Sequence, residues 1–481
     1  MLIGMDAGGT NTDLAMVDRE VTSVKVPNTL GIREVLSHAR APGRLAVSTS
    51  TPLNRVLTGD PARVQTILIP GPGLFWPGGI RGAVNHRGDI VEHLDSTEVG
   101  GVLASSRGDV LAITGKFSVR NPSLEQEVAA RALDHYAEER IAVSHHLATL
   151  DFPGRAATTR LNARMKEAVC LLAGEIGAER KDFFFFRGDG GLIPPAYAIR
   201  DPSVLYHSST AAAALGAFYL SKVEECLVVD IGGTTTDLVR LSGGKPAMET
   251  IVADGERTVT RAVAAITLPY GGDSVIEETI QPRRMGNALA FGGIRPTLTD
   301  ALNVTGCEIG NAGASGLLDR TSAERALEEY ISLVSRAVAA SGARMVVGTG
   351  YLAQFLVPRI ARHSGASFTI PPHAECANAV GVAVSRVTLT LHARFDSGRG
   401  AVVFNGEPQE LRTLGDDEAV LDRCRAEVKQ RAIAAGADPR DVEDVRVLHF
   451  HAYDVVRSSF RSARIADVVV QIAPGITAEA P

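Results

Sequence analysis

Cysteine, tryptophan and long apolar runs are all scarce in this chain of 481 residues. The five cysteines are odd in number and form no Cys-x-x-Cys pair, which favours reduced thiols and a cytoplasmic protein over a disulfide framework. No apolar run reaches the roughly 18 residues that a membrane helix needs, so we expect no membrane span. Asp6 comes too early for the apolar core of a signal peptide to precede it, which argues against secretion.

Two further absences narrow the classes of ligand. The net charge is −6 and lysine and arginine form no long cluster, which gives no reason to expect nucleic acid. The chain also lacks a Gly-x-x-x-x-Gly-Lys-Ser/Thr loop, which excludes a P-loop ATPase. Residues 348–353 fit a dinucleotide fingerprint, but no acidic residue ends a second strand about 20 residues later, as a ribose contact requires. We therefore expect no nicotinamide cofactor.

One nine-residue segment occurs twice in similar form. It reads DAGGTNTDL from Asp6 to Leu14 and DIGGTTTDL from Asp230 to Leu238, with seven of nine positions identical. Each copy lies between two apolar runs, which predicts a strand, a Gly-Gly turn and a strand. A Gly-Gly turn lets backbone N–H groups converge on a phosphate, and the first Asp can hold a hydrated Mg²⁺. An ordinary hairpin needs neither the second Asp nor the threonines, so the repetition favours a clamp for ATP.

A third element of this clamp is predicted at the Gly348-Thr349-Gly350 turn, which follows an apolar run. We assign Asp6 and Asp230 to the metal. The predicted nucleotide contacts are Gly8, Gly9, Thr10, Thr12, Asp13, Gly232, Gly233, Thr234, Thr235, Gly348, Thr349 and Gly350.

The paired hairpins resemble the phosphate motifs of the superfamily of sugar kinases, heat-shock chaperones and actin. An ordered set of further motifs is similar to the hydantoinase/oxoprolinase family and covers most of the chain. One segment departs from the family pattern: residues 208–213 read Ser-Ser-Thr-Ala-Ala-Ala where the family has Ser-Gly-Pro-Ala-Ala-Gly. The matching motifs are Thr49 to Asn54, Asn121-Pro122 with Glu125, Ser144-His145, Asn162-Ala163, Gly188 to Gly191, Gly271 to Ser274, Phe291 to Gly293, Pro296 to Ala301, and Ala377 to Ala379 with Gly381.

The resemblance implies an α/β fold of two ribonuclease H-like, actin-like ATPase halves around a nucleotide cleft. We place these halves at residues 1–205 and 206–390, and expect a small α+β appendage at 391–481. The implied activity is ATP-dependent opening of a cyclic amide, such as a hydantoin, 5-oxoproline or a lactam, through phosphorylation of the amide oxygen with Mg²⁺. The family also implies a possible B-type partner subunit; an oligomer is possible.

Several polar residues are candidates for the reaction itself. Asp237, Asp273 and Asp300 join Asp6 and Asp230 as catalytic candidates, and His145, Ser274 and Arg284 are candidates for substrate binding. Each has a structural alternative. Ser274 and Thr299 can cap helices, Arg284 can be a solvated charge, and His145 can serve a structural hydrogen bond. His449 and His451 share a strand face, but no third metal ligand accompanies them.

Two other functions remain open at this point: an ATP-driven activator or chaperone-like switch, and a small-molecule kinase that stops at phosphoryl transfer. Local patterns also predict several elements outside the hairpins. These are helices over 122–140, 158–176, 211–220, 321–341 and 416–435, a buried strand at 183–186, a hairpin over 401–413, and strands near 445–455 and 464–472. Ser322 is the predicted cap of the helix over 321–341, and Gly342 its stop.

Overall fold

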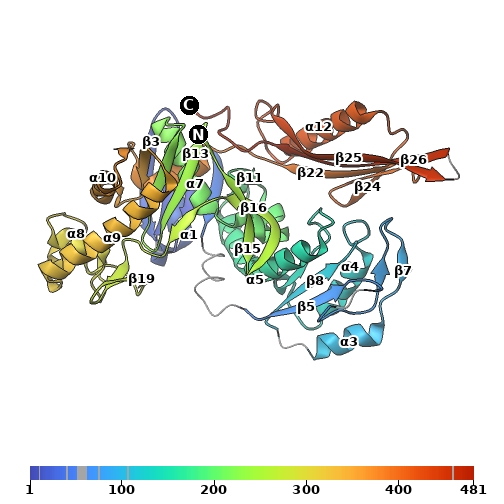
Figure 1. Ribbon diagram of the computed structural model, residues 1–481, viewed down its shortest axis with the longest axis horizontal. Coiled ribbons are helices and arrows are strands. Elements are labelled where there is room, and N and C mark those ends of the chain that lie inside the picture. Colours follow the sequence, from blue (N-terminus) through green and yellow to red (C-terminus); the bar gives the residue numbers. More distant parts are fainter. Residues whose placement is uncertain (10, 40–41, 51–61, 74–75, 106–107, 458–459) are drawn as a thin grey trace.

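The computed structural model describes residues 1–9, 11–39, 42–50, 62–73, 76–105, 108–457 and 460–481 (Figure 1). Two mixed sheets form the two halves of the ATPase-like fold. The first has the strand order β11-β10-β4-β1-β2-β3, and the second the order β14-β13-β12-β20-β21. Their strands are β1 (Leu2–Ala7), β2 (Asn11–Val17), β3 (Val21–Pro27), β4 (Arg44–Thr49), β10 (Phe183–Phe186), β11 (Leu192–Ile193), β12 (Cys226–Ile231), β13 (Thr236–Ser242), β14 (Lys245–Pro246), β20 (Met345–Thr349) and β21 (Ser367–Thr369).

Both sheets begin with the predicted hairpin. Asp6 pairs with Asp13 across β1 and β2, and Asp230 pairs with Asp237 across β12 and β13. In each half the first strand then pairs in parallel with a later one, β4 for β1 and β20 for β12. The repeat in the sequence is therefore a repeat of topology, and the two-lobed α/β architecture is confirmed.

A smaller lobe is formed by residues between β4 and α5. Three parallel strands in the order β5-β8-β9 form its sheet, so their carboxyl ends meet at one edge. α5 (Phe152–Glu179) then leads back to the first half, its amino-terminal part beside the lobe's sheet (Figure 1). The elements of this lobe are β5 (Val64–Ile69), β6 (Ala83–Val84), β7 (Ile90–Glu92), α3 (Ser96–Ala104), β8 (Val110–Gly115), α4 (Ser123–Ala132) and β9 (Ile141–Val143).

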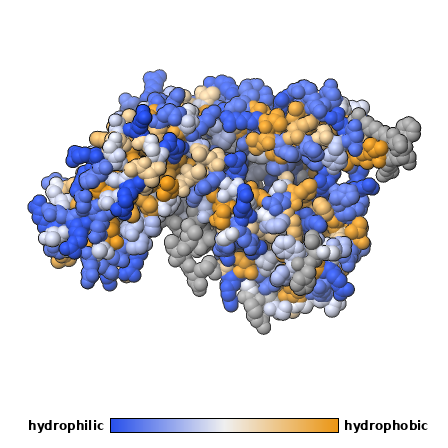
Figure 2. All heavy atoms as spheres, viewed as in Figure 1, coloured by the Kyte–Doolittle hydropathy of each residue, from blue (hydrophilic) through white to orange (hydrophobic). Residues whose placement is uncertain are grey.

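The end of the chain forms a five-stranded antiparallel sheet, ordered β24-β23-β22-β26-β25, which α12 (Asp417–Ala434) covers on one face. This is the predicted α+β appendage, at the upper right of Figure 1. Figure 2 shows patches of hydrophobic atoms on this part of the surface. Its strands are β22 (Thr390–Asp396), β23 (Ala401–Phe404), β24 (Glu407–Glu410), β25 (Val445–Arg457) and β26 (Phe460–Ile472).

The second half carries a subdomain around α9 (Arg320–Ser341), at the left of Figure 1. The apolar face of α9 packs on α8 (Leu298–Val304) and α10 (Ala353–Ser364). Gly342 ends α9 as expected, but Asp319 rather than Ser322 caps its start, because the Asp319 side chain accepts the Ser322 N–H. β18 (Ser274–Ile276) and β19 (Ile280–Arg284) also belong to this subdomain. β15 (Met248–Ala253) and β16 (Glu256–Val263) form a hairpin beside α5, and β17 (Ile266–Leu268) pairs with β13.

The predicted helix over 122–140 is shorter than expected. α4 ends at Ala132, and a turn and a short 3₁₀ helix (Glu138–Arg140) follow it. By contrast, α5 extends the predicted helix over 158–176 at both ends, with Asp151 as its cap. Among the described helices, none is both long and apolar enough to cross a membrane.

Two helices rich in small residues lie between the halves. α7 (Ser208–Ser221) and α11 (Ala377–Ala383) pack backbone to backbone, and α11 also packs on β1. A Cβ at Gly381 would lie 2.1 Å from the carbonyl oxygen of Ala212, and one at Gly4 would lie 1.9 Å from that of Ala379. Only glycine permits this approach, which brings the start of α11 up to both hairpins.

We expect Gly381→Ala to destabilise the protein, because the added methyl group must push α11 away from α7. Overpacking of this kind typically costs about 1–3 kcal/mol. Gly174→Ala is the matched control, because Gly174 is exposed on α5 and a Cβ there meets nothing within 4 Å. That change should stabilise the fold by about 0.5–1 kcal/mol. Urea unfolding measures both, and equal effects of the two changes would contradict the close packing.

Candidate functional site

The amide of Asn378 joins the two hairpins. Its Nδ2 lies 3.3 Å from Oδ2 of Asp6 and 3.5 Å from Oδ2 of Asp230, and it donates to Oγ of Ser209 at 3.1 Å. Ser209 in turn donates to Asp6 at 3.0 Å. The two predicted metal ligands, which are 224 residues apart in sequence (230 − 6), thus share one polar partner. The hairpins face one another across this point.

A hydroxyl group on the neighbouring parallel strand orients each of these carboxylates. Ser48 of β4 donates to Oδ1 of Asp6, and Thr349 of β20 donates to Oδ1 of Asp230 at 2.9 Å. The same arrangement therefore occurs in both halves. Thr349 is buried, and its hydroxyl group points at Asp230 rather than at the surface. The sequence had predicted a contact of Thr349 with the nucleotide instead.

Burial raises the pKa of all four hairpin aspartates. For Asp230 the pKa rises to about 7, through burial first and then through the charge of Asp237. Lys25 offsets part of this charge by pairing with Asp13 at 2.6 Å. Carboxylate oxygens that lack compensating positive charge are the donor set that Mg²⁺ prefers, so these residues fit the cation that the sequence implies.

The Gly-Gly turns present open backbone at the same place. Gly9, Gly232, Gly233 and Thr234 are exposed, and each turn closes with the first glycine N–H donating to the carbonyl three residues on. The predicted contact at Thr10 lies outside the described residues. Thr12 is buried, and its hydroxyl group donates to Asn28 at 2.9 Å. Thr235 is half-buried and Gly8 less exposed than Gly9.

Asp273 and Arg284 lie against the second hairpin. The Asp273 N–H donates to the Gly233 carbonyl at 2.7 Å, and its carboxylate accepts from Nε of Arg284 at 3.0 Å. Their side chains keep 13% and 24% exposure, which leaves this ion pair partly accessible beside the second hairpin. Ser274 is buried, and its hydroxyl oxygen accepts the Gly271 N–H within the same turn, so its contact is local.

Asp300 is enclosed by protein donors. Its carboxylate accepts the N–H groups of Leu289, Ala290 and Thr297 and the hydroxyl groups of Thr297 and Ser315, and the side chain is fully buried. Thr297 and Asp300 form a capping box at the start of α8. The expectation that Asp300 contacts the substrate does not fit this geometry, because every acceptor position faces the protein. The cap also differs from the predicted one, which was Thr299.

His145 follows β9 in the smaller lobe, at the carboxyl edge of β5, β8 and β9. The smaller lobe lies on the opposite side of Figure 1 from β19 and α8. Its Nδ1 lies 2.9 Å from Oε2 of Glu125, which directs Nε2 away from that carboxylate. Glu125 also accepts the N–H groups of Gly115, Ser144 and His145 and the Ser144 hydroxyl group. Burial raises the pKa of Glu125, but the hydrogen bonds and charge of His145, with Ser118 and Ser144, bring it below its usual range.

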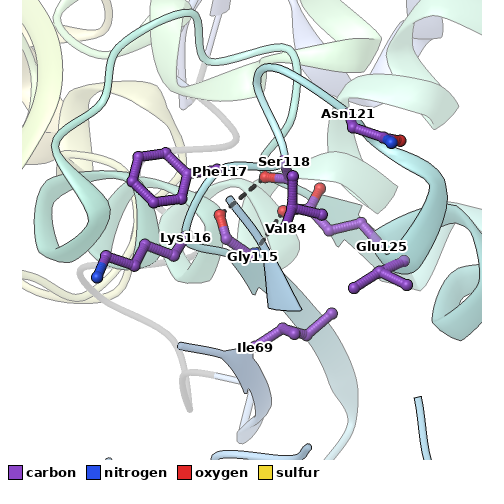
Figure 3. Close-up of a pocket in the computed structure, with 9 residues that line it drawn as sticks. Ile69, Val84, Gly115, Lys116, Phe117, Ser118, Asn121 and Glu125 are labelled. Carbon is purple, nitrogen blue, oxygen red and sulfur yellow. Dashed lines mark hydrogen bonds between the residues drawn. The ribbon is translucent and has the colours of Figure 1, made fainter. Parts of the chain in front are cut away.

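Arg155 completes this network from α5. The guanidinium group is fully buried, and it donates to the hydroxyl groups of Ser118 and Ser144 and to the carbonyls of Gly115 and Lys116. Burial lowers its pKa to about 10. The cavity beside Ser118 and Glu125 has a volume of about 10 Å³ (Figure 3). That volume is far below the 300–1,000 Å³ typical of ligand pockets.

The predicted substrate residues therefore form two groups. Asp273 and Arg284 lie at the second hairpin, whereas His145 lies in the smaller lobe. The sequence did not predict three residues that contact Asp6 or Asp230, namely Ser48, Ser209 and Asn378. Only Asn378 gave a local signal, as an amide in a helix of small apolar residues. Ser209 belongs to the segment that departs from the family pattern, and it nevertheless contacts Asp6.

A family model for hydantoinase/oxoprolinase matches residues 155–331, which include the second hairpin, Asp273 and Arg284. Over these residues the chain is similar to the hydantoinase/oxoprolinase family. No curated protein sequence gives a significant match.

Two solved structures share the fold over nearly the whole chain. A nucleotide-free acetone carboxylase, solved for the mechanism of ATP-dependent acetone carboxylation, is 15% identical, with a TM-score of 0.76 over 100% of this chain and 88% of the other. An ATP-dependent caprolactamase from Pseudomonas jessenii is 19% identical, with a TM-score of 0.64 over 98% of this chain and 87% of the other. At these identities the likeness establishes the shared fold.

The raised pKa of Asp230 makes stability depend on pH. Its folded-state pKa of about 7 exceeds the ordinary aspartate value of 3.8, so the folded state binds more protons and stability falls as pH rises between about 4 and 7. Without nucleotide or Mg²⁺, Asp230→Asn should therefore unfold at higher urea than the wild type at pH 8, with the difference vanishing near pH 4. Asp134→Asn, at an exposed position, is the control and should follow the wild type. An Asp230→Asn protein that is less stable at pH 8 would refute the buried-charge argument.

For Asp300 we expect a loss of stability rather than of substrate response. Asp300→Asn replaces an acceptor of backbone N–H groups by an amide with one acceptor oxygen, which should cost about 1–3 kcal/mol. Thermal unfolding measures this loss. The folded fraction should keep wild-type ADP release per mole. Unchanged melting together with lost substrate stimulation would restore Asp300 to the substrate site.

Proposed function

We propose that this protein is an ATP-dependent enzyme that activates the carbonyl oxygen of a small amide, with cyclic amides such as hydantoins, 5-oxoproline or lactams as the substrate class. The observation that carries the proposal is the shared contact of Asp6 and Asp230 with Asn378 between two glycine turns. The family of residues 155–331 and the fold shared with an ATP-dependent caprolactamase support the choice of amides.

The chemistry follows from the weakness of a resonance-stabilised amide as an electrophile. In the proposed reaction the amide oxygen attacks the γ-phosphorus of ATP, a new O–P bond forms, and the β,γ O–P bond breaks to release ADP. The carbonyl carbon is then open to water. Addition of water and cleavage of the ring C–N bond give an open-chain acyl phosphate, and a second water releases phosphate and the amino acid. The overall equation is therefore cyclic amide + ATP + 2 H₂O → amino acid + ADP + phosphate.

In this proposal the glycine turns bind the phosphates and the aspartates bind the metal. The exposed residues Gly9 and Gly233 offer backbone N–H groups to phosphate oxygens, and holding the phosphates is the main requirement of phosphoryl transfer. Asp6 and Asp230 would hold Mg²⁺, whose charge neutralises the phosphates. Asp13 and Asp237 lie in the same cluster of carboxylates, because they pair across the strands with Asp6 and Asp230, respectively.

The Asp273–Arg284 pair is proposed to meet the transferring phosphoryl group. A guanidinium group is suited to phosphate, and Arg284 keeps enough exposure to reach a ligand. His145 is proposed to contact the substrate at another step, with Nε2 as the free ring nitrogen because Glu125 binds Nδ1. A B-type partner subunit that completes the hydrolysis stays a prediction from the family resemblance.

The test is an ATPase screen across hydantoins, 5-oxoproline and lactams, with product analysis. We expect ADP release to depend on one class of cyclic amide, and an open-chain product to appear with it, once any partner subunit is present. ADP release with a phosphorylated and unopened substrate would indicate a kinase. ADP release that no amide stimulates would indicate a switch. Asp6→Asn should lower turnover at least a hundredfold at saturating Mg²⁺, whereas Asp18→Asn, exposed on the turn after β2, should not.

A further inference from the structure

One short turn beside the cleft brings together three side chains that can ligate a metal. The ligand atoms of His373, Glu375 and Cys376 all lie within 4.8 Å of one another. His373 precedes the 3₁₀ helix Ala374–Cys376 in a left-handed conformation, with φ of 63°. Residues three apart eclipse one another in a 3₁₀ turn, which explains why the imidazole and the thiol share one side.

The donor atoms differ from those of the cleft. A nitrogen, an oxygen and a sulfur form a set that suits Zn²⁺ and similar borderline cations, whereas Mg²⁺ prefers oxygen alone. The thiol is buried, the imidazole is half-buried and the carboxylate is exposed, so an ion can enter from solvent on the side of Glu375 and His373.

The surroundings carry negative charge. The carboxylate of Asp13 lies close enough to Glu375 for electrostatic repulsion, and Lys25 is the cation that pairs with Asp13. A divalent cation between Glu375 and Cys376 would reduce this repulsion. It would also replace the present contact of the Cys376 thiol, which donates to the His373 carbonyl at 3.4 Å.

This turn also connects the end of β20 with the amide of Asn378. The Ala374 carbonyl accepts the N–H of Gly350, at the end of β20, at 2.8 Å. Two residues after Cys376, Asn378 reaches Asp6 and Asp230. The geometry of this turn therefore sets the position of both Gly350 and the bridging amide.

We propose that His373, Glu375 and Cys376 bind a divalent cation of the zinc class, with one coordination position left to water, and that the ion fixes the turn between Gly350 and Asn378. On binding, the Cys376 thiol releases its proton to solvent and the thiolate forms the bond to the metal. The site is distinct from the magnesium site of the proposed function and does not depend on it. The competing account is that Cys376 is a packed thiol whose hydrogen bonds go to the His373 carbonyl and to Ser23.

Cobalt titration separates these accounts. The full chain, stripped with a chelator and free of nucleotide, is titrated with Co²⁺ while the near-ultraviolet thiolate-to-cobalt band is recorded. We expect a saturable band at one equivalent, which Zn²⁺ abolishes and Mg²⁺ does not. Cys376→Ser should remove the band, and His373→Gln should weaken binding at least tenfold. Cys307→Ser, at a half-buried thiol after α8, is the matched control and should keep the band.

A band that survives in Cys376→Ser, or Co²⁺ binding without a band, would overturn the proposal, as would the absence of saturable binding. Should Cys376→Ser fail to fold, Glu375→Gln at the exposed position replaces it, with at least tenfold weaker binding expected and unchanged affinity counting against the site. Since no ATP or substrate is present, failure here leaves the ATPase prediction standing. Failure of the ATPase screen likewise leaves the cobalt result valid.

Discussion

The contact of the α11 backbone with α7 and β1 is the constraint on which the rest of the site depends. Gly4, Gly216 and Gly381 remove the side chains that would separate these three elements, since a Cβ at each would lie within about 2 Å of a carbonyl oxygen. This approach brings Asn378 within reach of carboxylates from two sheets. Without it, the hairpins of the two halves would have no common partner.

The arrangement concentrates negative charge in a buried place. Asp6 and Asp230 each accept a hydrogen bond from a hydroxyl group on the adjacent parallel strand, yet burial still raises their pKa. Buried carboxylates without full compensation lower the stability of a fold, and such local costs are typical of functional sites. The fold tolerates this cost because large apolar clusters surround both sheets.

The sequence predicted those parts of the site whose signal is local. A hairpin needs only its own nine residues, so the repeat revealed both hairpins and their aspartates. The partners of Asp6 lie 42, 203 and 372 residues away in sequence, and no local sequence pattern predicts such contacts. Asp300 illustrates a second limit of sequence-based prediction. A Thr-x-x-Asp pattern before an apolar run is compatible with a capping box or with a binding site, and only the buried donors around the carboxylate distinguish the two roles. Likewise, the division of the substrate candidates between two lobes depends on topology that the individual motifs do not contain.

α5 has a mechanical consequence. At 28 residues it is a rod of about 42 Å. Arg155 near its start is bonded to the Ser118 and Ser144 loops of the smaller lobe, whereas Val169 and Ile176 near its end belong to the core under the first sheet. Between them, Thr158 accepts the Val259 N–H from β16 of the second half. A stiff lever held at three points transmits tilt: a rotation of about 5° at one end displaces the other by roughly 4 Å over this length. A tilt of α5 would therefore move Arg155 together with the Ser118 and Ser144 loops that it holds.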